Sequence, residues 1–105
     1  MVNRLSQIEA KRELDRERNI ILVDVRNPEE YGEGHIPGAR LIPLNNLEME
    51  AEEQIPDKNA KIFVYCQSGK RSAAAGRILA ELGYSRVCEI GGIATWPYEI
   101  EKGIR

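Results

Sequence analysis

The residues of this sequence that are best suited to carry out chemistry lie in a short loop that begins at Cys66. The strand-like run 61–65 (KIFVY) ends directly before this cysteine. Six residues complete the loop: Gln67, Ser68, Gly69, Lys70, Arg71 and Ser72. Gly69 lets the backbone curl so that N–H groups point inward, and the helix expected next adds unpaired N–H groups and its positive dipole end. A thiol in this setting ionises below its ordinary pKa and needs no separate base to act as a nucleophile.

Two basic residues, Lys70 and Arg71, add positive charge beside this thiol and favour an anionic substrate. Lys70 is the better candidate for contact with the substrate, and its alternative is a solvated lysine. For Arg71 two roles stay open: contact with substrate, or closing the loop through its carbonyls or a neighbouring carboxylate. Asp24 and Arg26 lie at the end of the first apolar run, and we expect them to form an ion pair that braces the loop.

Other residues with reactive side chains favour structural roles. Cys88 lies in the strand-like run 86–90, where core packing is expected, and a resolving role with Cys66 is the minor alternative. His35 is the only histidine, and its turn context favours bonding to backbone over a general-base role. One histidine and two distant cysteines lack the spacing of zinc ligands, so we expect neither a metal nor another cofactor.

Strand-like and helix-like patterns alternate along the chain. Apolar, β-branched runs predict strands at 20–25, 39–42, 61–65 and 86–90. Helices are expected at 6–18, from Pro28 until Gly32 and Gly34 stop it, at 44–54, at 72–82, and briefly around Trp96. This alternation predicts an α/β fold with a largely parallel sheet. Ligands bind such sheets at the carboxyl ends of their strands, where Cys66 lies.

The ends of two helices carry local signals. Ser6 and Glu9 form a capping box before the first helix, and Asn19 is expected to end that helix in a left-handed conformation. The apolar stripe of this helix comprises Leu5, Ile8, Ala10 and Leu14. Pro97 would clash one turn back in a final helix that began at Gly92. That helix is therefore expected to be short or to begin near Thr95, with Trp96 covering the sheet.

Length and charge exclude several classes of protein. The 105 residues suit one domain, 1–105, and 15 basic against 17 acidic residues leave no excess of positive charge for nucleic-acid binding. No apolar run approaches the roughly 20 residues of a membrane span. The charged stretch 9–18 leaves no room for a signal peptide, and two cysteines are too few for a disulfide scaffold, so a cytoplasmic location is expected.

At this point four motifs resemble one family. Cys66-x-x-Gly69-x-Arg71-Ser72 is similar to the active-site loop of the rhodanese-like family, of the thiosulfate sulfurtransferase type. The segments 22–31 (LVDVR, then PEEY) and 34–39 (GHIPGA) resemble its first two signatures, and Gly91-Gly92 with Trp96 resembles the last. The resemblance covers most of the chain in the right order. It implies the single-domain form of a three-layer α/β sandwich, with helices on both sides of a mostly parallel sheet.

The resemblance also implies a sulfurtransferase that works by double displacement. Cys66 would take a sulfane sulfur from a small anionic donor such as thiosulfate and become a persulfide. The backbone N–H groups of residues 67–72 would stabilise that persulfide, with Lys70 and Arg71 binding the donor. A thiophilic acceptor, cyanide or a thiol, would then remove the sulfur. No particular protein partner is implied.

Two alternative functions stay open. Cysteine-dependent phosphatases and arsenate reductases also use a cysteine in an anion-binding loop, but their loops need five residues between the cysteine and the arginine. Here four residues, 67–70, separate Cys66 from Arg71, and no general acid is evident. The second alternative is a sulfur carrier or binding module without turnover. Inactive rhodanese-like domains typically lack the cysteine, which this chain retains.

Overall fold

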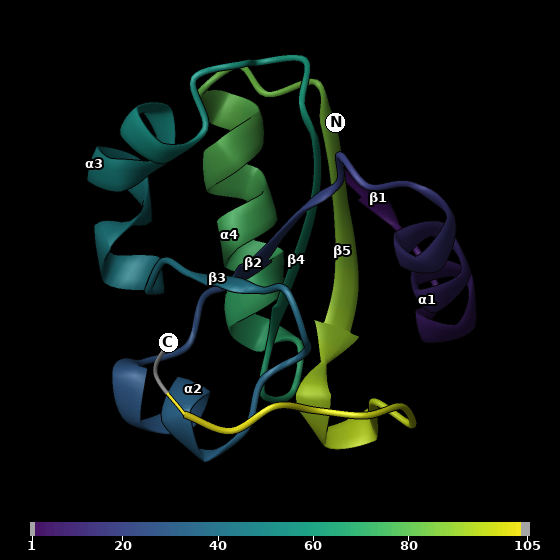
Figure 1. The fold of residues 1–105 in the computed structure, drawn as a ribbon. Coiled ribbons are helices and arrows are strands. Elements are labelled where there is room, and N and C mark those ends of the chain that lie inside the picture. The colour runs from purple at the N-terminus through teal and green to yellow at the C-terminus, as the bar shows by residue number, and fades with distance from the viewer. Residues whose placement is uncertain (1, 104–105) are drawn as a thin grey trace.

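Five strands form one sheet in the computed structural model, which describes residues 2–103 (Figure 1). The strands are β1 (Val2–Arg4), β2 (Ile21–Asp24), β3 (Arg40–Leu41), β4 (Lys61–Cys66) and β5 (Arg86–Gly92). Their order is β1-β5-β4-β2-β3, and every neighbouring pair is parallel. The predicted α/β fold is thus confirmed.

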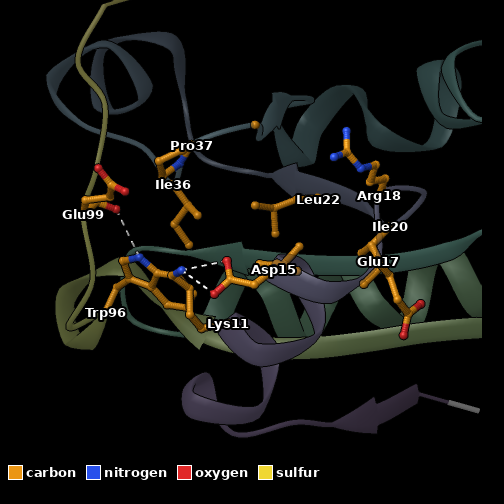
Figure 2. Close-up of a pocket in the computed structure, with 12 residues that line it drawn as sticks. Lys11, Asp15, Glu17, Arg18, Ile20, Leu22, Ile36, Pro37, Trp96 and Glu99 are labelled. Carbon is orange, nitrogen blue, oxygen red and sulfur yellow. Dashed lines mark hydrogen bonds and ion pairs between the residues drawn. The ribbon is translucent and has the colours of Figure 1, made fainter.

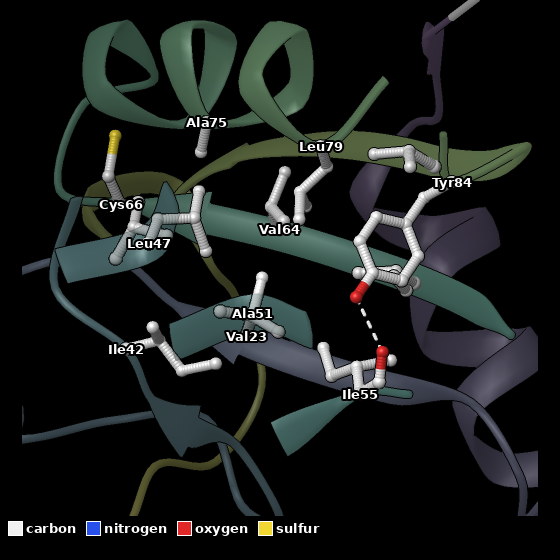
Figure 3. Packing of buried hydrophobic residues seen from close by; sticks show 13 residues of the cluster. Val23, Ile42, Leu47, Ala51, Ile55, Val64, Cys66, Ala75, Leu79 and Tyr84 are labelled. Atoms are coloured by element: carbon white, nitrogen blue, oxygen red, sulfur yellow. Dashed lines mark hydrogen bonds between the residues drawn. The ribbon is translucent and has the colours of Figure 1, made fainter. Parts of the chain in front are cut away.

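Helices cover both faces of this sheet. The helices are α1 (Gln7–Arg16), α2 (Pro28–Glu33), α3 (Leu44–Gln54) and α4 (Lys70–Glu81). Side chains of a strand alternate between its faces, and in β4 Val64 packs into one cluster with α3 and α4 (Figure 3). Phe63 and Tyr65 pack into a second cluster with α1, α2 and Trp96. This makes the three layers that the resemblance implied.

The strand β1 was absent from the sequence-based prediction. It is a polar edge strand of three residues, and it pairs with β5 in the register Val2↔Val87 and Arg4↔Glu89. The chain leaves it through Leu5, whose N–H donates to the Glu89 carbonyl over 3.1 Å. Such a short strand takes its stability from the neighbouring strand, so it leaves no apolar run for sequence reasoning to find.

The first helix differs from its prediction at two points. Ser6 caps α1 as expected, and its side chain accepts the N–H of Glu9. The helix ends at Arg16, with Glu17 extended, and in residues 2–103 only glycines adopt a positive φ, so the left-handed cap at Asn19 is wrong. Ile8 is 60% exposed and does not belong to the buried stripe, because α1 buries only a narrow face around Ala10.

Three other expectations about helices are corrected. Gly32 lies inside α2, which ends at Glu33. The helix α4 begins at Lys70 instead of Ser72, because Gly69 with φ 106° serves as its N-cap. The expected final helix is a 3₁₀ turn (η1, Ile93–Thr95) that stops before Trp96 and Pro97. In the described part of the chain, no helix has the length and apolar character needed to cross a membrane.

Candidate active site

Cys66 is the last residue of β4, at the carboxyl edge of the sheet. Its sulfur is almost fully buried, with the residue 1% exposed, and Sγ accepts hydrogen bonds from two backbone N–H groups. Gly69 N–H donates over 3.0 Å and Ser72 N–H over 3.3 Å. Both donors are available because the left-handed Gly69 turns the chain from strand to helix within three residues. The N-terminal end of α4 therefore directs the N–H groups of its N-cap Gly69 and of Ser72 at the sulfur.

The loop favours the thiolate form of Cys66. Burial alone would raise the pKa of this thiol, but hydrogen bonds from Ser72, through both its N–H and its hydroxyl, and from the N–H groups of Gly69 and Ser68 outweigh it. The net result is a pKa below the ordinary value of a thiol. Hydrogen bonds to the charged form of a group lower the pKa in this way. These contacts therefore shift Cys66 toward its ionised form, which is the more nucleophilic form of a thiol.

Strand β5 supports the loop from the side through Gly92, which sequence analysis had not connected with the loop. A β-carbon at Gly92 would lie only 2.5 Å from the carbonyl carbon of Gln67 and 2.8 Å from Cα of Ser68. The Gln67 carbonyl also accepts the N–H of Ala94 over 3.1 Å. The loop that follows Cys66 therefore rests directly on the backbone of Gly92. The doubled glycine was the available signal.

Arg71 forms an ion pair with an acidic residue from another element. Its guanidinium donates to both carboxylate oxygens of Glu30, on α2, over 2.8 and 2.9 Å. This contact lowers the pKa of Glu30 to about 2 and raises that of Arg71. The arrangement corresponds to the loop-closing role that was left open for Arg71. Lys70, in contrast, is exposed at the start of α4.

Asp24 and Arg26 form the expected ion pair, and both are buried. The Arg26 guanidinium donates to Asp24 over 2.7 Å, to the carbonyl of Gly34 over 2.6 Å, and to the side-chain oxygen of Gln67 over 3.3 Å. The Tyr65 hydroxyl donates to the same carboxylate over 2.7 Å. Arg26 thus links the end of β2, the end of α2 and the loop.

The remaining candidates lie away from the sulfur of Cys66. His35 has its Nδ1 atom 2.9 Å from the carbonyl of Tyr31 and its ring stacked on that tyrosine, so the backbone-bonding role is confirmed. Cys88 packs with the second core cluster, whereas Cys66 belongs to the first cluster on the opposite face of the sheet. Burial raises the pKa of the Cys88 thiol. This placement contradicts a resolving role for Cys88.

Two hollows differ in their relation to the loop. One, of about 460 Å³, lies beside Gln67 and is also lined by Arg26, Glu30, Ile93 and other residues. The other, of about 480 Å³, lies between α1, the start of β2 and the Trp96 segment (Figure 2). No residue of the described loop 66–72 lines this second hollow. Of these two hollows, the one beside Gln67 is the one that a residue of the loop lines.

No described group of three or more histidine, cysteine or acidic side chains is arranged to hold a metal ion. The fold presents a buried cysteine whose sulfur accepts hydrogen bonds from two backbone N–H groups, at the carboxyl edge of a parallel sheet. Such a site defines a class of cysteine-dependent proteins that bind anions and transfer groups through sulfur.

Comparison with known proteins identifies the family within that class. Residues 6–98 match the rhodanese-like domain, and the chain belongs to this family. It is 42% identical over 71 residues to the thiosulfate sulfurtransferase PspE of Escherichia coli (strain K12), covering 68% of each chain. It is 36% identical over 97 residues to a sulfurtransferase of Allochromatium vinosum, covering 91% of this chain and 89% of the relative.

A solved structure described as "rhodanese with anions from E. coli" supports the same family assignment. It is 38% identical, with a TM-score of 0.75, and the match covers 80% of this chain and 99% of that one. Together these relatives support sulfurtransferase activity of the rhodanese type in general.

Proposed function

We propose that this protein moves a sulfane sulfur from thiosulfate to a thiophilic acceptor through a persulfide on Cys66. The observation that carries the proposal is the cradle around Sγ, in which the N–H groups of Gly69 and Ser72 donate to a buried sulfur. The donors that stabilise the thiolate are also suited to an anionic persulfide in the same place. The named relatives add independent support for sulfur transfer.

The first half-reaction forms the persulfide. The Cys66 thiolate attacks the outer sulfur of thiosulfate, a new S–S bond forms, and the old one breaks. Sulfite leaves with the electron pair, so charge is conserved and no oxidant is needed. Lys70, exposed at the start of α4, offers its positive charge to the incoming dianion. Arg71 is held by Glu30, so its part is to fix the loop against α2.

The second half-reaction returns the enzyme to its starting state. An acceptor, cyanide or a thiolate, attacks the outer sulfur of the persulfide, and Cys66 leaves as a thiolate. The loop that lowers the pKa of this thiol also makes it a better leaving group. The hollow beside Gln67 is the proposed route for the acceptor. The cytoplasmic location expected from the sequence stays a prediction.

A steady-state assay tests this function. With thiosulfate and cyanide, the wild type should release thiocyanate and Cys66→Ser should release none. Lys70→Gln should raise KM for thiosulfate while leaving kcat for a neutral sulfur donor unchanged. Hydrolysis of an aryl phosphate that depends on Cys66, without thiocyanate release, would favour a phosphatase. Sulfur uptake without turnover would favour a sulfur carrier.

A further inference from the structure

Glu89 is a buried acid that the two half-reactions do not use. It lies on β5, on the same side of the strand as Val87, and is 7% exposed. Carboxylates are seldom buried without a partner or a purpose. Its position on the strand that supports the loop places it behind the reacting sulfur.

Two contacts define the surroundings of this carboxylate. Its Oε1 atom lies 3.4 Å from the hydroxyl of Ser72, the same residue whose N–H donates to Cys66 Sγ. The same oxygen lies 3.4 Å from Nη2 of Arg4, on the edge strand β1. One residue therefore separates the carboxylate from the sulfur on one side, and an arginine partly offsets its charge on the other.

We propose that Glu89 and Arg4 form a charge pair behind the catalytic loop that sets how readily Cys66 ionises. Glu89 is a positioning residue: it holds Ser72 and places a fixed negative charge behind the sulfur. Arg4 opposes that charge from the solvent side, since its side chain is 79% exposed. The consequence for sulfur transfer rests on the proposed function, whereas the effect on ionisation does not.

The hydroxyl of Ser72 is one means of coupling. It carries a single proton, and three acceptors other than the sulfur lie close to its oxygen: the Gly69 carbonyl at 3.1 Å, the Gly91 carbonyl at 3.3 Å and Glu89 at 3.4 Å. A charged acceptor competes for this proton more strongly than a neutral one. Glu89 thus competes with Cys66 for the hydrogen bond from the Ser72 hydroxyl. Its negative charge also disfavours the thiolate form of Cys66, because like charges repel.

Two other acids near the loop are already paired. From β2 and α2, the acids Asp24 and Glu30 are matched by Arg26 and Arg71. Lys70 adds one positive charge at the start of α4. The Glu89–Arg4 pair differs because one partner is buried and the other is mostly in solvent. Solvent screens Arg4 more than Glu89, so the carboxylate acts on the loop with much of its charge.

A charge that opposes the ionisation of Cys66 has a use in a two-step reaction. A thiolate becomes less nucleophilic as its pKa falls, by roughly threefold per unit, while it becomes a better leaving group. The N–H donors alone would favour discharge of the persulfide over its formation. Glu89 restores nucleophilicity in the first half-reaction. The pair therefore balances the two steps.

The test uses two substitutions with opposite expected effects. Glu89→Gln keeps the shape and removes the charge, so the pH midpoint for alkylation of Cys66 by iodoacetamide should fall by at least about half a unit at low salt. Arg4→Gln exposes the loop to the full charge of Glu89, so the midpoint should rise. The double variant should behave as Glu89→Gln alone. Glu53→Gln, an exposed charge change on α3, is the matched control and should shift nothing.

Cys88→Ser is the background for all of these proteins, so that one thiol is followed. Circular dichroism checks that each variant is folded. Unchanged midpoints, or shifts of both variants in the same direction, would overturn the proposal, because loss of structure alone predicts a common direction. Alkylation needs no sulfur donor, so its failure is separable from failure of the proposed function, which would appear as missing thiocyanate with a normal alkylation profile.

Discussion

Replacing Gly92 with alanine perturbs the loop although no residue of the loop itself is substituted. The backbone of Gly92 is extended, with φ −129° and ψ 151°, a conformation that alanine adopts freely. The effect is therefore steric alone. The new methyl group would clash with the carbonyl oxygen of Gln67 and lie 2.5 Å from its carbonyl carbon, and ordinary contact begins at 3.4 Å, so the loop must retreat by at least about 0.9 Å.

The size of the effect follows from the two hydrogen bonds on the sulfur. A hydrogen bond to a charged group contributes about 1.5–3 kcal/mol, and 1.36 kcal/mol corresponds to one pKa unit. Losing one N–H donor from the 3.0 and 3.3 Å pair should therefore raise the pKa of the Cys66 thiol by about one to two units. A displacement near 1 Å in a reacting site costs about 100-fold in rate. Overpacking should also cost about 1–3 kcal/mol of stability.

Alkylation by iodoacetamide as a function of pH, together with thiocyanate release, measures both effects. Gly38→Ala is the control: its φ of 87° disfavours alanine, but no atom lies within 4 Å of the new carbon. It should lose about 1–2 kcal/mol of stability with a wild-type alkylation midpoint. A Gly92→Ala protein with the wild-type midpoint and rate would refute the role given to this glycine.

Three further substitutions test the surroundings of the loop. Glu30→Gln should lower the free energy of unfolding by on the order of 1 kcal/mol near neutral pH. The Glu30 carboxylate contributes fully to the free energy of unfolding above its unfolded pKa of 4.5, and this contribution is lost as pH falls toward about 2. The free energies of unfolding of the two proteins, measured by urea titration, should therefore converge in acid. Cys88→Ser should leave thiocyanate release within about twofold of wild type, because burial raises the pKa of that thiol; a larger loss would contradict its structural role. Arg26→Met should lower stability by about 3–5 kcal/mol in urea titrations, since it leaves the buried carboxylate of Asp24 without its cationic partner, and a smaller loss would mean that water reaches that carboxylate.

Local patterns in the sequence were enough to predict most of the helices and strands and the α/β fold of this protein. The apolar run before Cys66 formed β4, and the helix expected to start at Pro28 formed as α2. These features depend on residues within a few positions of one another. The placement of Cys66 at the carboxyl edge followed from the alternation of strands and helices.

Contacts between distant segments could not be read in the same way. Glu30 and Arg71 are 41 positions apart, and nothing in either segment pairs them. Gly92 supports the loop at Gln67, 25 residues earlier, and the reason for a glycine there appears only when β5 lies beside the loop. The short strand β1 depends on the same neighbour. Such features belong to tertiary packing, which one sequence does not specify locally.

The central claim is that Cys66 carries the transferred sulfur, and intact-protein mass spectrometry tests it most directly. After brief exposure to thiosulfate, the wild type should gain the mass of one sulfur atom and Cys66→Ser should gain none. Cyanide should then remove the added mass and release thiocyanate. An adduct that persists in Cys66→Ser, or thiocyanate release by a wild type that never gains sulfur, would contradict the persulfide mechanism.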